Sequence, residues 1–266
     1  SKPQVLILGC NFAGLGAAQK IRDHAGRLVD ITVIDRKAYL DYIPNISLEI
    51  FEGRDPAVTM HMPIVEALAK DHVSFEQAEV LQIDVDKRQV KIQPNERAGA
   101  PEYNISYDYL VIALGAKLAL EDIEGFAEHG HTVCDAFHAN RLIRYRQEDY
   151  KGGPIAVGSA RFKQGTRGRP EWLPTAAAAC EGPPVEVSLS LAHWLEEHGK
   201  GSAKNITMFT PGDLIAEDAG EKVVKQLLDT ASSMGFGYLH NTQDIKRLTA
   251  DGIEFADGRS LQTELN

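Results

Sequence analysis

The sequence predicts an α/β protein with two parallel-sheet domains, each built on a strand–turn–helix–strand unit. Three apolar strands that end in glycine indicate this. One is Val5–Leu8, followed by Gly9; the others end at Gly115 and Gly158. Apolar runs without alternation are typical of strands buried on both faces, as in parallel sheets covered by helices.

The bulk composition narrows the class of protein. The chain has 266 residues, is 43% hydrophobic and carries a net charge of −10. An acidic chain of this kind does not suit a nucleic-acid groove, whose footprint is basic, so we expect no nucleic-acid partner. No apolar run approaches the roughly 18 residues of a membrane span, and we see no signal-peptide pattern. A cytoplasmic or cytosol-facing protein is the default expectation.

The first domain opens with a nucleotide-binding pattern. Val5–Leu8 leads into the turn Gly9–Gly14, a helical pattern runs to about His24, and the strand 31–34 ends at Asp35. The motif reads G-x-N-x-x-G where the dinucleotide fingerprint has G-x-G-x-x-G.

Each position of this motif has a physical role. Gly9 makes the tight turn, and Gly14 lets the helix pack closely on the strand. Asn11 occupies the middle position, where the backbone approaches a pyrophosphate, and asparagine tolerates unusual backbone angles. Asp35 is placed to accept hydrogen bonds from a ribose hydroxyl. We predict a bound adenine dinucleotide; the alternative is an ordinary α/β turn.

The remainder of the first half predicts a helix from Pro63 through Leu68 and then a meander of short strands at 73–76, 80–83 and 90–92. A buried strand at 107–116 follows. A meander followed by such a strand is the usual crossover of two-dinucleotide flavoproteins. We therefore expect a Rossmann-like FAD-binding domain at 1–115, with its meander at about 73–106, and a linker at 116–150.

The second half repeats the strand–turn–helix–strand pattern, but its nucleotide-binding motif is degenerate. After Gly158 the chain reads Ser-Ala-Arg-Phe-Lys, without a helix start or a third glycine, and about twenty irregular residues follow. This stretch is basic at Arg161, Lys163, Arg167 and Arg169. We predict a second Rossmann-like domain at 151–266 with a degenerate nucleotide motif, and hairpin turns at Asp251-Gly252 and Asp257-Gly258.

Cys180 lies just ahead of the displaced helix, which we expect to begin near Pro183 or Pro184 and to reach about Gly199. The partial positive charge of a helix N-terminus favours a thiolate, the reactive form of cysteine. The alternative is a buried, inert thiol at a tight turn. Glu181 and Glu186 flank the helix start and are candidates to take or relay a proton; for Glu186 a solvated or capping side chain is an equal alternative.

The other cysteines and the histidines give weaker signals. Three cysteines are too few for a structural disulfide framework, so any disulfide would be catalytic. The histidines lack the spacing of a metal site, and we expect no metal there; they are His129, His131, His138, His193 and His198.

These motifs together resemble the sulfide:quinone oxidoreductases of the archaeal type, flavoproteins of the two-dinucleotide-domain class that are related to type II NADH dehydrogenases. The resemblance rests on the turn 5–14, Asp35, the strand 110–115, Val133-Cys134-Asp135 and Ala179-Cys180-Glu181-Gly182-Pro183.

The resemblance implies that FAD is the cofactor, that sulfide is the substrate and that a membrane quinone takes the electrons. Cys180 matches the redox cysteine close to the flavin, and Cys134 matches a more peripheral cysteine that holds the flavin covalently in some members. Cys10 has no match, and we interpret it as structural. The catalytic residues expected are Cys180, Cys134, Glu181 and Glu186. The residues expected to bind the cofactor are Gly9, Asn11, Phe12, Ala13, Gly14, Asp35, Arg36, Pro44, Ala113 and Gly115.

The sequence also departs from the family pattern. The family has a third redox cysteine, a late Gly-Asp flavin motif and C-terminal amphipathic helices that seat it on the membrane, and these 266 residues contain none of them. The chain therefore looks like the N-terminal two-thirds of such an enzyme. We expect a peripheral membrane association through a C-terminal region that is not in this sequence, and a homo-oligomer is possible.

Two other functions stay open. A type II NADH:quinone oxidoreductase is the first, although nothing in the spoiled second motif cradles the phosphates of a nicotinamide dinucleotide, and Cys180 would have no role. The second is a catalytically silent FAD-binding or partner-binding fragment, because only one of the two expected flavin-side cysteines is encoded.

Overall fold

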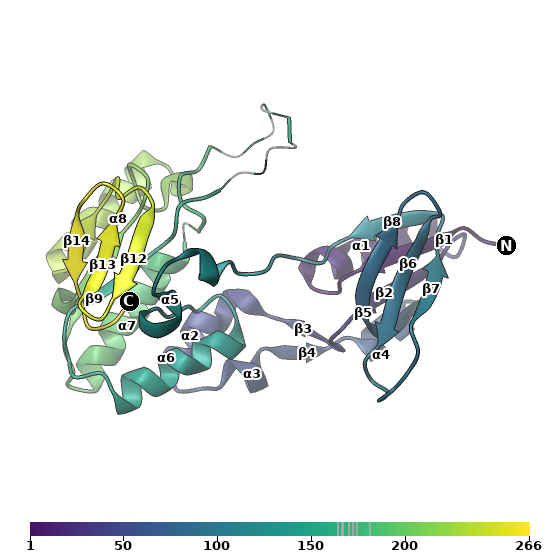
Figure 1. Cartoon of the computed structure of the whole chain (residues 1–266), viewed down its shortest axis with the longest axis horizontal. Helices are drawn as coiled ribbons and strands as arrows, with labels where there is room; N and C mark the ends of the chain where they lie inside the picture. Colours follow the sequence, from purple (N-terminus) through teal and green to yellow (C-terminus); the bar gives the residue numbers. More distant parts are fainter. Residues whose placement is uncertain (164, 166–167, 170, 172, 174, 181) are drawn as a thin grey trace. The chain divides into compact units, whose positions relative to one another are not determined.

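The computed structural model of the chain describes all residues except 164, 166–167, 170, 172, 174 and 181. The chain forms two compact units (Figure 1). The first consists of Ser1–Tyr42 and Met60–Leu118, and the second of Ile43–Thr59 and Ala119–Asn266.

The first unit is built on a six-stranded sheet in the order β7-β6-β5-β2-β1-β8. Four of these strands are parallel: β1 (Gln4–Leu8), β2 (Asp30–Asp35), the first part of β5 (Val73–Asp84) and β8 (Tyr109–Ile112). The predicted α/β class is confirmed. Helix α1 (Phe12–Ala25) connects β1 to β2, and α4 (Val65–Lys70) precedes β5.

The meander differs in detail from the expectation. The two short strands expected at 73–76 and 80–83 form one continuous strand, β5, whose second part pairs antiparallel with β6 (Gln89–Pro94), which in turn pairs with β7 (Tyr103–Ser106). A register shift between Val80 and Gln82 bends the pairing. A bulge of this kind lets one strand serve both the parallel sheet and the meander.

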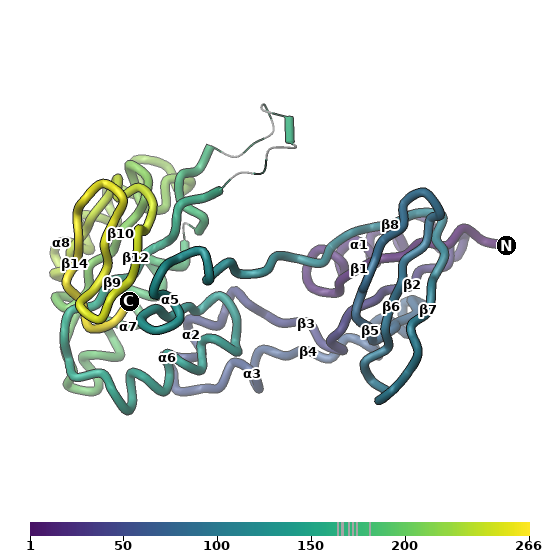
Figure 2. The backbone as a smooth tube through the Cα atoms, in the orientation of Figure 1, coloured from purple at the N-terminus to yellow at the C-terminus, as the bar shows by residue number. Residues whose placement is uncertain are grey.

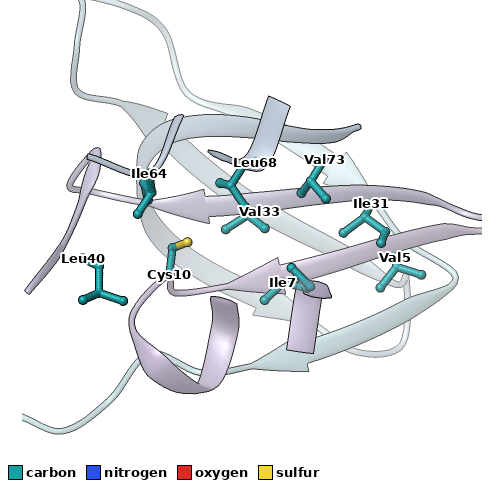
Figure 3. Close-up of a cluster of buried hydrophobic side chains, with 10 residues drawn as sticks. Val5, Ile7, Cys10, Ile31, Val33, Leu40, Ile64, Leu68 and Val73 are labelled. Atoms are coloured by element: carbon teal, nitrogen blue, oxygen red, sulfur yellow. The ribbon is translucent and has the colours of Figure 1, made fainter. Parts of the chain in front are cut away.

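Alternate residues of β1 enter two separate cores. Val5 and Ile7 pack with Cys10, Ile31 and Val33 on the face covered by α1 and α4 (Figure 3). Leu6 and Leu8 point to the opposite face, where they pack with Ile34, Ala78 and meander residues. Burial on both faces explains why the strand is a continuous apolar run rather than an alternating one.

A small ribbon completes the first unit. Strands β3 (Tyr39–Asp41) and β4 (His61–Pro63) pair antiparallel and run side by side (Figure 2). The chain passes into the second unit after Tyr42 and returns from it at Met60.

The second unit contains a three-stranded parallel sheet in the order β11-β10-β9. Its strands are β9 (Ile155–Gly158), β10 (Ile206–Phe209) and β11 (Gly237–Leu239), connected by helices α7 (Pro183–Glu197) and α8 (Glu221–Met234). Three further strands, β12 (Ile245–Thr249), β13 (Gly252–Phe255) and β14 (Ser260–Gln262), form an antiparallel sheet with the predicted hairpin turns. None of the helices in the described part of the chain combines the length and the apolarity needed to cross a membrane.

Two helical stretches of the second unit lie outside the range 151–266 that we expected for the second domain. These are α2 (Ile46–Phe51) and α3 (Pro56–Thr59) in the first stretch, and α5 (Phe126–His129) and α6 (Ala136–Glu148) in the second. We expected the former in domain 1–115 and the latter in the linker 116–150. Both stretches lie in the second compact unit, because α2 packs on α6 and α7.

A buried arginine holds α2 in place. The Arg146 side chain of α6 is 1% exposed, and its Nη2 donates to the carbonyl of Ile50 at the end of α2. Its guanidinium also lies over the rings of Phe51, at 5.1 Å, and Trp194, at 4.8 Å. Burial lowers the pKa of Arg146 to about 10. The carbonyl at a helix C-terminus and two aromatic faces thus replace part of the hydration that the cation loses.

His131, in the loop before α6, is a half-buried base whose Nε2 atom is inaccessible to solvent. Its Nδ1 faces the carbonyl oxygen of Asn266 at 3.3 Å, and its ring lies 4.9 Å from that of Tyr145. Burial, and next the nearby charge of Arg141, lower the pKa of His131 to about 4. The imidazole is therefore neutral in the folded protein at neutral pH.

This burial predicts an acid-sensitive second unit. The unfolded chain takes up a proton at His131 near the ordinary histidine pKa of about 6.5, whereas the folded chain resists it until about pH 4. The free energy of unfolding should therefore fall as pH drops through this window. His131→Phe, which keeps a ring beside Tyr145, should weaken that dependence in urea titrations between pH 7 and 4. His193→Gln, at an exposed position, is the control; identical pH profiles for wild type and His131→Phe would contradict the prediction.

Candidate functional site

The turn between β1 and α1 has no room for a side chain at two positions. Gly9 has a φ of +95°, and a Cβ atom there would overlap the carbonyl oxygen of Ala113, just after β8. A Cβ atom at Gly14 would overlap the carbonyl oxygen of Gly9. The two glycines therefore allow α1, β1 and the end of β8 to approach one another, which is the packing expected of a dinucleotide turn.

Asn11 fills the middle position in a different way from the one we expected. Its backbone has a φ of −96° and needs no special tolerance, so that part of the interpretation is wrong. Instead its side-chain amide pairs with the backbone of Asp41 in β3: Nδ2 donates to the Asp41 carbonyl (3.1 Å), and Oδ1 accepts from the Asp41 N–H (2.9 Å). Asn11 thus ties the turn to the β3–β4 ribbon.

The N-terminus of α1 is suited to an anion. Phe12, Ala13 and Gly14 form its first turn, which contains no acidic residue, and Asn11 makes no side-chain cap. The first N–H groups of a helix have no partner within the helix, and they lie at the positive end of its dipole. A pyrophosphate matches this arrangement.

Asp35 lies beside the same turn at the end of β2. Its Oδ2 accepts a hydrogen bond from the N–H of Cys10 (2.7 Å), and its Oδ1 accepts one from the N–H of Lys37 (2.9 Å). A carboxylate has about four acceptor positions, so capacity for a ribose hydroxyl remains. The residues at the turn therefore fit a dinucleotide such as FAD.

The other residues expected at the cofactor are less closely grouped. Ala113 borders Gly9, and its N–H donates to the Leu8 carbonyl (2.7 Å). Arg36 and Gly115 are exposed. Pro44 is exposed in a short 3₁₀ helix, Ile43–Asn45, which belongs to the second unit.

Cys10 is enclosed in the core of the first unit. Its side chain lies among Leu40, Ile64 and neighbouring apolar groups (Figure 3). Burial, and secondarily the Asp35 carboxylate, raise the pKa of Cys10 to about 11. The thiol is therefore protonated at neutral pH, which agrees with a structural role.

In the second unit the chain leaves the sheet after β9 and returns to it at Cys180. We call this segment, residues 159–180, the excursion. Two short segments, 160–162 and 177–179, pair antiparallel around the bridge Arg161–Ala178 and form what we call the stem. Its backbone hydrogen bonds run from the Phe162 N–H to the Ala177 carbonyl and from the Ala179 N–H to the Ala160 carbonyl, both 2.8 Å. The stem brings Cys180 back to the end of β9.

Ser159 joins the two ends of the excursion. Its Oγ accepts a hydrogen bond from the Cys180 N–H at 2.9 Å, and the Ser159 residue is 9% exposed. Cys180 itself is half-buried, and α7 begins three residues later at Pro183 as predicted. Sequence reasoning did not identify Ser159 or Asp41. Ser159 directly follows the strand-ending glycine, whereas Asp41 had no local signal.

The acidic and peripheral residues of the predicted site are dispersed. Glu186 is exposed in the first turn of α7. Glu181 and Arg167 lie outside the described residues. Cys134 is exposed in the loop before α6, and its N–H donates to Thr132 Oγ1 (3.2 Å). The residues fall into three groups: the turn of the first unit, the Ser159–Cys180 junction and the Cys134 loop.

Comparisons with known proteins agree with this geometry. The family model described as pyridine nucleotide-disulphide oxidoreductase matches residues 3–162. A sulfide-quinone reductase of Aquifex aeolicus is 28% identical over 196 residues, which are 73% of this chain and 40% of that protein. A type II NADH:quinone oxidoreductase of Staphylococcus aureus is 29% identical over 150 residues, 56% of this chain and 35% of that protein.

A solved structure shows the same fold. The sulfide:quinone oxidoreductase of Aquifex aeolicus superimposes with a TM-score of 0.79 at 23% identity, over 100% of this chain and 57% of that one. The chain therefore spans less than two thirds of the length of these relatives.

The Asn11–Asp41 pairing predicts a stability effect. Asn11→Ala removes two side-chain hydrogen bonds at a half-buried position, so the free energy of unfolding should fall by about 1–2 kcal/mol in urea titrations. Asn95→Ala is the matched control, because it removes one exposed hydrogen bond to the Arg36 carbonyl. If the free energy of unfolding falls equally in the two variants, the Asn11–Asp41 pairing contributes no more stability than one exposed hydrogen bond.

The environments of Cys10 and Cys134 predict selective alkylation. With a pKa of about 11, Cys10 is about one-thousandth thiolate at pH 8, and it is buried as well. Iodoacetamide at pH 8 should therefore label the exposed Cys134 and leave Cys10 unmodified until the protein is unfolded. Peptide mass spectrometry measures both sites, and comparable labelling rates in the folded protein would refute this assignment.

Proposed function

The chain belongs to the pyridine nucleotide-disulphide oxidoreductase family, and on that premise we propose that its protein oxidises sulfide and passes the electrons through FAD to a membrane quinone. FAD is the cofactor of this family and of its quinone-linked relatives. The chain is accordingly assigned to the flavin-dependent oxidoreductases.

One observation carries the choice of sulfide. The hydrogen bond from Cys180 to Ser159 holds a cysteine at the end of β9, just ahead of α7, where a nucleotide turn would otherwise lie. A cysteine in that position fits sulfur chemistry and has no role in binding a nicotinamide dinucleotide. The name of the Aquifex aeolicus relative supports the same choice.

The first unit supplies the cofactor site. The N-terminus of α1 would receive the pyrophosphate, and Asp35 would accept a ribose hydroxyl. Gly9 and Gly14 leave space for this approach. When bound, FAD supplies an acceptor for an electron pair.

The second unit supplies the thiol chemistry. Cys180 would act as the thiolate that exchanges with sulfur, favoured by the positive end of the 15-residue helix α7. Glu186, exposed in the first turn of that helix, and Glu181 are the proposed proton carriers. Cys134 is the proposed peripheral cysteine. Oxidation of hydrosulfide to zero-valent sulfur releases two electrons and one proton. Reduction of a quinone to a quinol consumes two electrons and two protons, so the second proton is taken from water.

The alternative function is an NADH:quinone oxidoreductase. It is favoured by the relative of that name in Staphylococcus aureus. The stem weighs against it, because the chain leaves β9 into the excursion instead of turning directly into a helix N-terminus. A third possibility is that the 266 residues bind FAD without catalysing a reaction.

The proposal predicts which reductant bleaches the flavin. Sulfide added anaerobically to the FAD-loaded protein should remove the visible absorbance of the oxidised flavin, and NADH should not. Cys180→Ser should slow the reduction by sulfide at least about a hundredfold, because a serine hydroxyl is not a nucleophile at neutral pH.

The other outcomes separate the alternatives. Bleaching by NADH but not by sulfide would favour the NADH-linked reading. Unchanged reduction by sulfide in Cys180→Ser would exclude Cys180 from the reaction. Bound FAD with no response to either reductant would support the silent fragment.

A further inference from the structure

We propose that Ser159 is a positioning residue that sets the reactivity of Cys180 through the backbone of that cysteine. This inference rests on the proposed role of Cys180 as a thiolate. Ser159 lies one residue after β9, and its Oγ accepts the Cys180 N–H at 2.9 Å across 21 positions of sequence.

The stem explains why a hydroxyl is needed at this point. Its two backbone hydrogen bonds, from Phe162 and from Ala179, flank the Arg161–Ala178 bridge, and neither uses the N–H of Cys180. In an antiparallel ladder successive N–H groups point to opposite sides. The N–H of Cys180 follows a bonded one and points away from the ladder, and the Ser159 hydroxyl accepts it.

The Ser159 hydroxyl both donates and accepts a hydrogen bond. Besides accepting from Cys180, its Oγ donates to the carbonyl of Ala160 at 3.3 Å. The residue is almost buried, at 9% exposure, so an alanine there would leave the Cys180 N–H without this acceptor. The backbone of Cys180 would then lose this restraint on its position relative to the start of α7.

This movement matters because the field of a helix end is short-ranged. The favourable interaction with a negative charge falls off within the first turn. Cys180 precedes Pro183, the first residue of α7, by three positions, so its thiolate gains only if the intervening chain is held close to the helix. Ser159 supplies that restraint from the sheet side.

Several charged groups border this junction. Arg161 lies in the opposite segment of the stem, and Asp213 follows Gly212, which lies against Ala177. Glu186 lies in the first turn of α7, and Glu181 is outside the described residues. All of them remain in a Ser159 variant, so a change in the Cys180 titration between wild type and variant reports the lost hydroxyl.

The test is a pH titration of Cys180 alkylation. Iodoacetamide labelling of the FAD-loaded protein is followed by peptide mass spectrometry across pH 5 to 10, and the midpoint reports the thiol pKa, whereas the plateau reports access. In Ser159→Ala the midpoint should rise and labelling at pH 7 should slow about fivefold. Ser159→Thr, which retains the hydroxyl, should restore the wild-type midpoint.

Ser202→Ala is the matched control for a general loss of rigidity in the second unit. Ser202 also accepts a backbone N–H, that of Lys204, but it caps the 3₁₀ helix Ala203–Asn205 before β10, at the opposite end of the parallel strands. Ser202→Ala should leave the Cys180 midpoint unchanged. An equal shift in Ser202→Ala, or an unchanged midpoint in Ser159→Ala, would overturn the proposal.

This experiment uses neither sulfide nor quinone. If sulfide fails to bleach the flavin while the Cys180 midpoint still depends on Ser159, the proposed reaction fails and the positioning role stands. If sulfide bleaches the flavin and the midpoint does not move in Ser159→Ala, the reaction stands and the positioning role fails.

Discussion

The absence of a side chain at Gly9 and Gly14 is the constraint on which the first unit depends. A Cβ atom at either position would overlap a backbone carbonyl, that of Ala113 or that of Gly9 itself. Without this close approach α1 could not lie against β1 and β8, and the core below it would open. The first N–H groups of α1 lie at this turn, so one packing requirement underlies both the fold and the proposed cofactor site.

The second unit also begins with an apolar strand that ends in glycine, but the chain takes a different path after it. Gly158 is packed against the ring of Phe209, and the chain then leaves the sheet instead of turning into a helix. The stem and the Ser159 hydroxyl return it to the end of β9 at Cys180. The thiol chemistry that we propose for the second unit rests on this position of Cys180.

The three cysteines show how environment separates identical side chains. Cys10 is enclosed by apolar groups beside a carboxylate, which favours the neutral thiol. Cys134 is exposed in a loop, and Cys180 is half-buried ahead of a helix start. Burial thus distinguishes Cys10 from the two thiols that we propose for exchange.

Local sequence was sufficient for the elements whose causes are local. The strand of Val5–Leu8, the glycine turn, the proline-started helix α7 and the hairpin turns near Gly252 and Gly258 were all predictable, because each depends on a few adjacent residues. The α/β class follows from them, and so does the position of Cys180 before a helix.

Tertiary structure alone decided what depends on contacts between distant residues. The amide of Asn11 meets the backbone of Asp41, thirty positions away, and this partner gives the asparagine its role. Helix α2 lies in the second unit because Arg146, 96 positions from Ile50, bonds to its last turn. Ser159 reaches Cys180 only because the stem closes. No local pattern encodes these pairings, since each partner becomes a neighbour only when the chain has folded.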